Sequence, residues 1–586
     1  MMMATFEAWA PLAKKVQVDV KGRRETMMPG RDEGWWRADV ADAGDGDDYT
    51  FVLDDGPGLA DPRSMYQPEG PEGPSRIVDL SKIKWQIRKF QPEPLESAVI
   101  YELHVGTFTP SGTFESAVEK LDHLVDLGVT HVELLPVGEF SGERGWGYDG
   151  VCIYAPHHAY GGPHGLTRLI DACHVKGLAV IIDVVYNHFG PEGSHLKEFG
   201  PYFTDRYRTP WGDAVNYDGP HSGPVRKYAI DNALMWLRDF RADALRIDGV
   251  HAIIDTSAVH ILEELASAVC DLRACQGRHV SLIGESDLND PRVISPASAG
   301  GYGLDAQWAD DFHHSVHSLI TGESDGYYAD FGTLANLAKS YRNAFVYDGA
   351  FSQVRHRKHG RGVPSYLDGS RFVVFMQNHD QVGNRIDGTR VGHICSERRQ
   401  MTGAALVLAS PFVPMIFQGE EWAAGAMFQY FTDYQSPDLA EAVRQGRRRE
   451  FADFGWDPEK VPDPQSPDTF KRSKLDWDEL HHEPHRGMLE WYTKLIALRK
   501  SLASLCNHRR DLVQACFDEQ ERWILIVRCC IAVVCNLSDE PRRIPLASGE
   551  AMLLLSSDDD SLLVDGALEM PGESVSIVQL GECKCR

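Results

Sequence analysis

The chain has 586 residues, of which 43% are hydrophobic and 25% charged, as is ordinary for a globular protein. This length is too great for one ordinary hydrophobic core and predicts about two to four domains. The formal net charge of -27 argues against nucleic acid or an anionic membrane surface as a partner. The longest apolar stretch, 403–417, is interrupted by Ser410, Pro411 and Pro414, and it is too short to span a membrane. A neutral ligand stays compatible with this composition.

The N-terminal segment MMMATFEAWAPLA lacks the basic and apolar regions of a secretory signal, so we expect a cytoplasmic protein. In that compartment the 12 cysteines are expected to be reduced. The close groups Cys529–Cys530 and Cys583–Cys585 have no second pair at the spacing of a zinc site. The cysteines therefore favour neither a disulfide nor a metal site.

The first part of the chain has the pattern of a small β domain. Within residues 6–22, Val16, Val18 and Val20 alternate with polar residues, which is typical of a half-buried strand. Further strand-like segments follow at 34–40 and 49–55, and the segment 56–78 is rich in proline and glycine. We interpret residues 1–92 as an immunoglobulin-like β-sandwich.

From about residue 97 the pattern changes to short apolar runs that alternate with helical periodicity. Near-continuous Val/Ile/Leu runs joined by helices predict parallel strands buried on both faces. The eight predicted strands are 99–106, 129–137, 178–188, 244–250, 280–287, 303–308, 372–380 and 411–422. They predict a (β/α)8 TIM barrel over 93–504, with its longest insertion, 189–222, over the mouth. Apolar runs at 522–538 and 574–582 then predict a C-terminal β-sandwich over 505–586.

Three carboxylates end three of these predicted strands. Asp248 ends ALRID, Glu285 follows VSLIG, and Asp380 ends FVVFMQNHD. Catalytic groups of TIM barrels lie at the C-terminal ends of several strands, and two or three acids converging there are what glycosidic bond cleavage needs. One such acid alone fits a structural ion pair equally well.

The neighbouring residues predict different roles for the three acids. Side chains two apart on a strand point the same way, so Arg246 should keep Asp248 ionised as a nucleophile, with Asp183 on its other side. Like-charge repulsion should keep Glu285 protonated as the general acid. Asp380 would offset positive charge in the transition state. A retaining mechanism requires the Asp248 and Glu285 carboxyls about 5–5.5 Å apart.

Several aromatic and histidine residues permit two interpretations. Trp146, Tyr148, Trp211 and Tyr217 could stack on sugar rings or anchor loops. Core packing is favoured over glucan binding for Trp35 and Trp36. The pair in DDFHH (310–314) could indicate a metal, but substrate or loop contacts fit better because no matching ligand spacing accompanies it.

These segments resemble the four signature regions of the α-amylase superfamily, glycoside hydrolase family 13. DVVYNH (183–188), LRIDGVH (245–251), IGES (283–286) and FMQNHD (375–380) match them in order. The resemblance implies that Asp248 is the nucleophile, Glu285 the acid/base and Asp380 the transition-state stabiliser. It also implies that the subsite of the cleaved glucose is lined by Tyr148, His188, Arg246 and His379.

Within the superfamily the chain is similar, nearly end to end, to the malto-oligosyltrehalose trehalohydrolases. FEAWAPLA (6–13), YELHVGTFTPSGTF (101–114), GYDGVCIYAPHHAYGGP (147–163) and QNHDQVGNR (377–385) are among the stretches that carry the similarity. Such enzymes hydrolyse the α-1,4 bond next to the terminal trehalose of maltooligosyl trehalose, with water as the second substrate and no cofactor, and a maltooligosyl trehalose synthase supplies the substrate. Further implied substrate contacts are His251, Asp310, Asp311, Phe312, His313, His314, Gln381 and Asn384.

Two alternatives remain at this point. A glycogen branching or debranching enzyme would share the acids, and a non-catalytic glucan-binding homologue would typically have lost one of them. For the choice of trehalose ends, our hypothesis is a short cleft formed by the 189–222 insertion and a DDFHH loop, with Trp211 and Asp311 contributing. Gly249, where a slightly larger residue such as alanine is expected after the nucleophile, is predicted to loosen the strand end.

Overall fold

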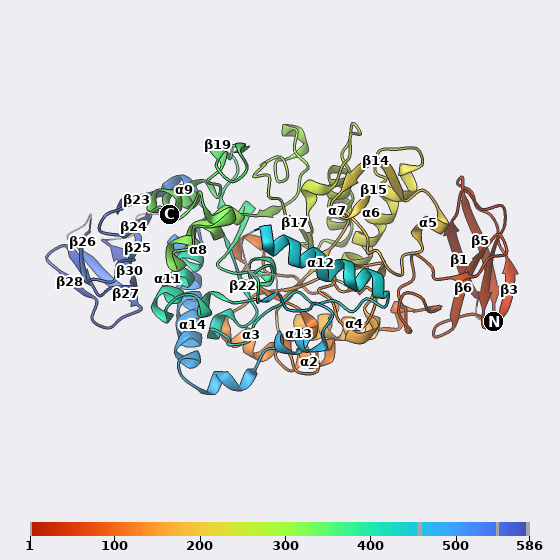
Figure 1. The fold of residues 1–586 in the computed structure, drawn as a ribbon, viewed down its shortest axis with the longest axis horizontal. Coiled ribbons are helices and arrows are strands. Elements are labelled where there is room, and N and C mark those ends of the chain that lie inside the picture. The colour runs from red at the N-terminus through yellow and green to blue at the C-terminus, as the bar shows by residue number, and fades with distance from the viewer. Residues whose placement is uncertain (1–2, 454–459, 547–549, 582–586) are drawn as a thin grey trace.

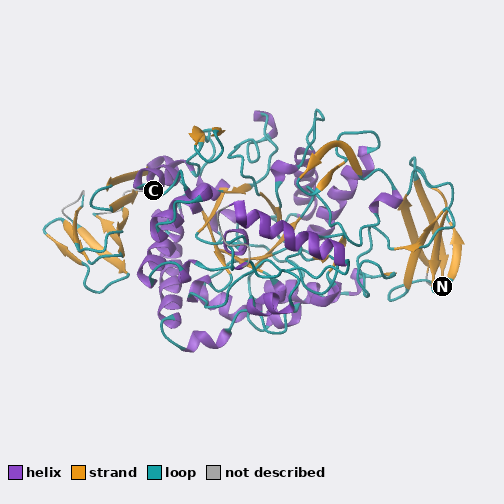
Figure 2. Ribbon diagram, viewed as in Figure 1, coloured by secondary structure: helices purple, strands orange, loops and turns teal. Residues whose placement is uncertain are grey.

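A computed structural model describes residues 3–453, 460–546 and 550–581 (Figure 1). The chain forms an elongated molecule with a β domain at each end and a helix-rich body between them (Figure 2). Cys583 and Cys585 lie outside the described residues. No helix of the described residues is long and apolar enough to cross a lipid bilayer.

The N-terminal residues form two antiparallel sheets. One has the order β1 (Met3–Trp9), β5 (Trp35–Ala41), β4 (Met28–Pro29); the other has the order β3 (Arg23–Thr26), β2 (Val16–Val20), β6 (Asp48–Leu53), β7 (Gly58–Leu59), with β8 (Ser75–Arg76) paired to β6. Val16, Val18 and Val20 are buried, as their alternation predicts. Trp35 and Trp36 are partly buried against the core, and Trp36 Nε1 donates to the carbonyl oxygen of Ala10, which fits packing.

The eight predicted barrel strands are confirmed as one closed parallel barrel. In spatial order it contains β9 (Ile100–Leu103), β10 (His131–Leu134), β13 (Ala179–Val184), β16 (Ala244–Ile247), β17 (Ser281–Gly284), β18 (Ala306–Trp308), β21 (Phe372–Phe375) and β22 (Val413–Phe417). Every strand except β18 ends before the predicted segment does. The last residues of each predicted segment are no longer paired with the neighbouring strands and form the rim of the barrel. Polar side chains among them are thereby freed to face the barrel mouth.

Helices surround this barrel (Figure 2). The longer ones are α4 (Gly162–Val175), α6 (Ser222–Arg238), α7 (Ile261–Gln276), α8 (Asp310–Thr321), α9 (Leu334–Asn343), α11 (Glu397–Leu408), α12 (Pro437–Asp453) and α14 (His485–Ser501). Shorter elements are α1 (Val105–Phe108), α5 (Leu196–Phe199), α10 (His379–Gly383), α13 (Pro467–Arg472), α15 (Ala503–Cys506), β11 (Gly138–Glu139), β12 (Cys152–Pro156), β19 (Asp348–Ser352) and β20 (Arg357–Gly360). The helical pattern at 114–127 divides into α2 (Phe114–Val118) and α3 (Leu121–Leu127).

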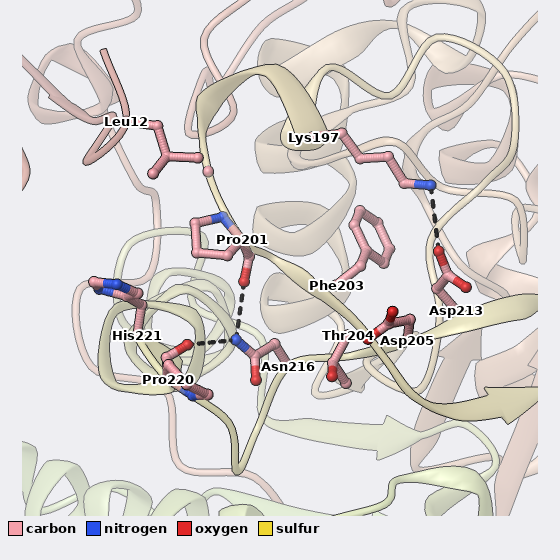
Figure 3. Close-up of a pocket in the computed structure, with 11 residues that line it drawn as sticks. Leu12, Lys197, Pro201, Phe203, Thr204, Asp205, Asp213, Asn216, Pro220 and His221 are labelled. Carbon is pink, nitrogen blue, oxygen red and sulfur yellow. Dashed lines mark hydrogen bonds and ion pairs between the residues drawn. The ribbon is translucent and has the colours of Figure 1, made fainter. Parts of the chain in front are cut away.

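The insertion after β13 is a β-hairpin, β14 (Phe203–Thr209) paired with β15 (Gly212–Val215). At its base, Asn216 Nδ2 donates to the carbonyl oxygens of Pro201 and Pro220 at 3.0 and 2.9 Å. This base borders a hollow of about 530 Å³ that Leu12 of the N-terminal domain also lines (Figure 3). The hairpin is therefore fixed at the junction between the N-terminal domain and the barrel.

The C-terminal residues form a five-stranded sheet and a three-stranded sheet. The first has the order β23 (Val513–Asp518), β24 (Trp523–Arg528), β25 (Ile531–Asn536), β30 (Ser574–Leu580), β27 (Ala551–Ser556); the second has β26 (Arg542–Pro545), β29 (Ala567–Met570), β28 (Leu562–Val564).

Reduced thiols are found at nine described cysteines, but Cys530 is disulfide-bonded, which corrects the expectation of reduced thiols at that residue.

Candidate active site

The three predicted acids meet at one cavity. Asp248, Glu285 and Asp380 lie beyond β16, β17 and β21, whose C-terminal ends share one rim of the barrel. They line a cavity of about 620 Å³. Its other lining residues are Trp146, Tyr148, Asp149, His188, Phe189, Pro191, Trp211, Gly249, His251, His379, Asn384, Tyr430, Tyr434, Leu439 and Val443.

Arg246 on β16 contacts three carboxylates from one fully buried position. Its Nη1 lies 2.6 Å from Asp183 Oδ2 and 3.0 Å from Asp248 Oδ1, and its Nη2 lies 2.9 Å from Glu285 Oε2. The guanidinium also lies over the Trp308 ring, 4.2 Å from its centroid. The predicted Asp183–Arg246–Asp248 arrangement is present. A guanidinium held by several acids and an aromatic face has a fixed orientation.

Asp248 is held in its ionised form. Burial raises the pKa of this carboxyl, but the positive charge of Arg246 and the neighbouring His188 outweigh burial and lower it below its ordinary value. Asn187 Nδ2 donates to Asp248 Oδ2 at 2.7 Å and to its backbone carbonyl at 2.9 Å. Both of these hydrogen bonds from Asn187 Nδ2 are thus made to Asp248. The carboxylate is positioned and charged, as a nucleophile must be.

Glu285 has the opposite character. Burial, opposed by Arg246 and assisted by the charges of Asp248 and Asp380, raises the pKa of its carboxyl well above the ordinary value. Like-charge repulsion contributes as predicted, but burial is the larger cause. Gly249 N donates to Glu285 Oε2 at 2.7 Å, on the same oxygen that contacts Arg246. A neutral carboxyl here would carry its proton on Oε1, because Oε2 already accepts.

A buried acid on the first strand supports Asp380. Glu102 on β9 accepts from His379 Nδ1 at 2.6 Å and from its backbone N–H at 2.9 Å. Burial lowers the pKa of His379, but Asp380 and Glu102 raise it to about 9, so the ring is an imidazolium at neutral pH. His379 Nε2 lies 3.4 Å from Asp380 Oδ2, and Asn384 Nδ2 donates to Asp380 Oδ1 at 3.1 Å.

The aromatic residues divide between the two interpretations. Tyr148 lines the cavity, donates to Asp183 Oδ2 at 2.6 Å and stacks on His379. Trp211, at the tip of the hairpin, is 50% exposed and stacks on His188 with centroids 4.5 Å apart. Trp146 and Tyr217 are buried and donate to backbone carbonyls, which is loop anchoring, although Trp146 also borders the cavity.

The DDFHH segment corrects the prediction of a substrate loop, because it begins helix α8. Asp311 accepts from Asn289 Nδ2 and from the backbone N–H groups of Val346 and Tyr347, at 2.7–2.8 Å. Phe312 is fully buried and packs on Tyr341 and Phe412. These three bonds and this packing place Asp311 and Phe312 in the interior, away from the residues that line the cavity.

The rest of the segment is placed similarly. His313 contacts the Met376 carbonyl at 2.7 Å and the Tyr328 hydroxyl at 3.0 Å, and His314 packs on Phe331. Asp310 is half-buried, and burial and then the charge of Asp380 raise its pKa to about 7, so it lies within electrostatic range of that acid, although it does not line the cavity. Of DDFHH, only Asp310 is placed by its charge environment near the site.

The remaining predicted contacts lie at or beside the cavity. His251 and Asn384 line it. Gln381 is half-buried in the first turn of α10, next to Asp380. Gly249 has φ +46, and a Cβ there would lie 2.5 Å from Asn187 Nδ2. The glycine therefore permits the Asn187–Asp248 contact, and a looser strand end at Gly249 stays a prediction.

Two features of the site were not predicted. One is Glu102, whose apolar strand context gave no sign of its contact with His379. The other is helix α12, which lies across the front of the barrel (Figure 1) and contributes Leu439 and Val443 to the cavity. Its Arg447 donates to Asn384 Oδ1 at 3.1 Å and so joins the helix to the rim.

One cluster in the described part of the chain has the composition of a metal site. Glu139, His157 and His158 bring one ligand atom each within 4.8 Å of one another. However, both ring Nδ1 atoms contact Glu139 Oε1, at 3.0 and 2.8 Å, which a hydrogen-bonded His–Glu–His group explains.

Comparison with known proteins identifies the family. Residues 75–210 match the family described as "Alpha amylase, catalytic domain", and residues 509–577 match a domain of unknown function. A putative α-amylase structure from Salmonella typhimurium superposes with a TM-score of 0.90 at 36% identity, covering 98% of each chain. A branching enzyme from Bacillus caldolyticus is 30% identical over 60% of this chain and 58% of its own length.

The relatives of higher identity share one name. Malto-oligosyltrehalose trehalohydrolase from Arthrobacter ramosus is 52% identical, covering 86% of this chain and 88% of the relative. The enzyme of that name from Mycobacterium tuberculosis is 46% identical and covers 99% of this chain and 100% of the relative. With its barrel and three rim acids, the chain belongs to the malto-oligosyltrehalose trehalohydrolase family of the α-amylase superfamily.

Proposed function

We propose that this chain is a retaining glycosidase that hydrolyses the α-1,4 bond next to the terminal trehalose of maltooligosyl trehalose and releases free trehalose. The observation that carries the proposal is the shared contact of Arg246 with Asp248, whose pKa is lowered, and with Glu285, whose pKa is raised. Two carboxyls with pKa values moved in opposite directions supply the nucleophile and the acid that this reaction needs.

In the first half of the reaction, an Asp248 oxygen attacks the anomeric carbon while the glycosidic bond breaks. Glu285 Oε1 gives its proton to the departing oxygen, so trehalose leaves with its hydroxyl restored. Glu285, now ionised, takes a proton from water, whose oxygen attacks the same carbon and frees Asp248. Arg246 stays within contact of both carboxyls and balances the charge that moves between them.

Asp380 and His379 would act on the same sugar ring that Asp248 attacks. The Asp380 carboxylate offsets the positive charge of the oxocarbenium-like transition state, and the His379 imidazolium donates to a sugar hydroxyl. Tyr148, stacked on His379, would support the glucose ring. We assign the remaining substrate contacts to His188, His251, Asp310, Gln381 and Asn384.

The choice of a trehalose end is assigned to two walls of the cavity. The hairpin contributes Trp211, and α12 with the segment before it contributes Tyr434, Leu439 and Val443. Because the α,α-1,1 linkage bends the disaccharide, a short cleft bounded by rigid rings would reject a straight maltosyl end. Asp311 no longer belongs to this hypothesis, because it bonds to interior backbone groups.

The substrate implies an enzyme that makes it. The reducing end of a maltooligosaccharide must first be converted to a trehalose unit, so we propose functional coupling to a maltooligosyl trehalose synthase. A cytoplasmic location for both enzymes stays a prediction.

The test compares purified protein on maltooligosyl trehalose and on the plain maltooligosaccharide of equal length, with an Asp248→Asn control. We expect free trehalose from the first substrate and little cleavage of the second. Equal cleavage of both would refute the specificity. Longer transfer products, detected by chromatography and by iodine staining on amylose, would favour the branching-enzyme alternative instead.

A further inference from the structure

A second cavity lies at the opposite end of the barrel from the acids. It has a volume of about 570 Å³. Some of its lining residues lie in the segment before β9, and the others lie at the C-terminal ends of α4, α6 and α7 or just after them. They are Arg88, Lys89, Phe90, Gln91, His174, Arg238, Arg241, Gln276, Gly277 and Arg278. Because these residues all precede parallel strands, they gather at the N-terminal end of the barrel, away from Asp248 and Glu285.

The charge of this lining is opposite to that of the chain. Five of the ten lining residues are arginine or lysine and none is acidic, in a protein of formal net charge -27. Such a surplus raises the local positive potential and attracts anions. A cation of this lining is available to an anion only to the extent that no carboxylate or carbonyl already binds it.

Two of the five cations contact a carboxylate. Arg238 forms two hydrogen bonds with Asp239, both at 2.7 Å. Arg278 donates to the carbonyl oxygens of Arg241 and Ala242 and lies 3.4 Å from Asp243, a carboxylate that His174 also contacts. Cations that bind carbonyls near the C-terminal ends of helices are a common structural device.

Structural contacts of this kind do not account for all of the positive charge at the cavity. In the described part of the chain, Arg88, Lys89 and Arg241 have no carboxylate within ion-pair distance, and the bond of Arg241 goes to the Ile87 carbonyl at 3.0 Å. Arg88 and Lys89 are exposed side chains at the cavity. Arg238 and Arg278 are partly neutralised by Asp239 and Asp243, and Arg241 feels the charge of Asp171, so the cluster of five cations keeps an excess of positive charge at Arg88 and Lys89.

The walls of the cavity are ordered. Gln91 Nε2 donates to the Gly277 carbonyl at 2.9 Å and fastens the 88–91 segment to the end of α7. Phe90 stacks on the His174 ring at 4.0 Å, and Arg241 lies over the Trp85 ring at 4.5 Å. Arg241, which this frame holds in place, loses less conformational entropy when it binds a ligand than a freely moving surface side chain does.

We propose that this cavity binds a phosphate-bearing anion, with Arg88, Lys89 and Arg241 as the charge-carrying contacts. Phosphate monoesters and diphosphates have the charge and the multiple acceptor oxygens that several guanidinium and ammonium groups satisfy together. The site is separate from the glycosidase cavity, and its proposal does not depend on the substrate assigned there. Binding to the folded state alone would stabilise the protein by mass action.

The test measures binding of pyrophosphate to the full-length protein by titration calorimetry at constant ionic strength. We expect one saturable site, with a melting temperature that rises with pyrophosphate concentration. Arg88→Gln/Lys89→Gln removes two exposed charges and should weaken binding by about tenfold or more while leaving glycosidase activity unchanged. Arg23→Gln/Arg24→Gln, which removes two exposed charges from β3, is the matched control and should bind as the wild type does.

Parallel titrations with inorganic phosphate, a hexose monophosphate and a nucleoside diphosphate distinguish the possible sources of the phosphate group. Should the double variant fail to fold, the Arg88→Gln and Lys89→Gln single variants replace it, each with a smaller loss of affinity. Absence of saturable binding to the wild type, or equal binding by the wild type and the folded variants at positions 88 and 89, would overturn the proposal.

Discussion

The segments LRIDGVH (245–251) and DDFHH (310–314) both combine aspartate with histidine, but they lie in different environments. The first follows a barrel strand, so Asp248 emerges at the rim and lines the cavity. The second begins a helix, whose first turn packs against neighbouring loops, and Asp311 is used to bind the backbone at 346–347. The comparison teaches that local residue type predicts chemistry only where the element exposes the side chain to the site.

The strand-end segment should show the largest effect on activity. Asp248→Asn removes the proposed nucleophile but keeps the side-chain volume, so we expect activity to fall by about 10⁴-fold or more with little change in melting temperature. Initial rates of trehalose release, with melting curves on the same samples, make the measurement. A variant with near-normal rates would remove Asp248 from the mechanism.

A positioning residue behind the rim should have the next largest effect. Glu102→Gln removes the negative charge that helps to raise the pKa of His379 to about 9. Because the folded-state pKa then falls, the imidazolium is lost at lower pH. The alkaline limb of the rate profile should move to lower pH, and kcat should drop by about 10–100-fold.

Glu133 on the adjacent strand provides a matched control for Glu102. Burial raises the pKa of its carboxyl well above the ordinary value, which favours the neutral form, and no hydrogen bond to His379 is found for it. Glu133→Gln should therefore leave the position of the alkaline limb unchanged. Identical pH profiles for the Glu102→Gln variant and the wild type would show that Glu102 does not act through His379.

Trp211 tests whether the exposed rim selects the substrate end. Trp211→Ala removes a ring that is half exposed in the cavity, and we expect about a tenfold fall in the ratio of kcat/KM for trehalose ends over maltose ends. Tyr217→Phe is the control, because it alters the same insertion but only removes the bond to the Tyr186 carbonyl. An unchanged ratio in Trp211→Ala would exclude this ring from end selection.

The sequence predicted the barrel and its three acids because both depend on local patterns. Eight apolar runs mark the strands, and Asp248, Glu285 and Asp380 each lie at the end of one. Burial of Asp311 could not be predicted in this way, because its partners Asn289, Val346 and Tyr347 lie 22–36 residues away.

Helix α12 was missed for a related reason. It follows β22 along the chain but returns across the barrel mouth, so its contribution of Leu439 and Val443 depends on tertiary contacts such as Arg447 with Asn384. Nothing in the local pattern of 437–453 distinguishes a helix over the site from one on the outside of the barrel. Long-range packing determines where such a helix lies, and the short-range periodicity of its sequence does not predict that position.

The helix-start segment should show the smallest effect on activity and a clear effect on stability. Asp311 Oδ2 accepts all three hydrogen bonds, and Asp311→Asn replaces this carboxylate oxygen with an amide oxygen, which is a weaker acceptor, so we expect a loss of about 1–3 kcal/mol in unfolding free energy. Burial, opposed by these bonds, raises the pKa of Asp311 to about 6. The folded state therefore binds more protons than the unfolded state between about pH 4 and 6, and ionisation of this carboxyl lowers stability as pH rises through that window.

The amide introduced by Asp311→Asn does not titrate, so the difference in stability between wild type and variant should be larger at pH 4 than at pH 7. Denaturant melts at the two pH values measure it, and kcat/KM per folded molecule should stay within about twofold of the wild type, with the preference for trehalose ends intact. Were that preference lost in a protein of unchanged stability, Asp311 would be a rim residue after all, and the contrast with Asp248 would fail. A loss of stability with the preference intact would show that two segments, both combining aspartate with histidine, serve different ends. The segment after a barrel strand serves catalysis, and the segment that begins a helix serves folding.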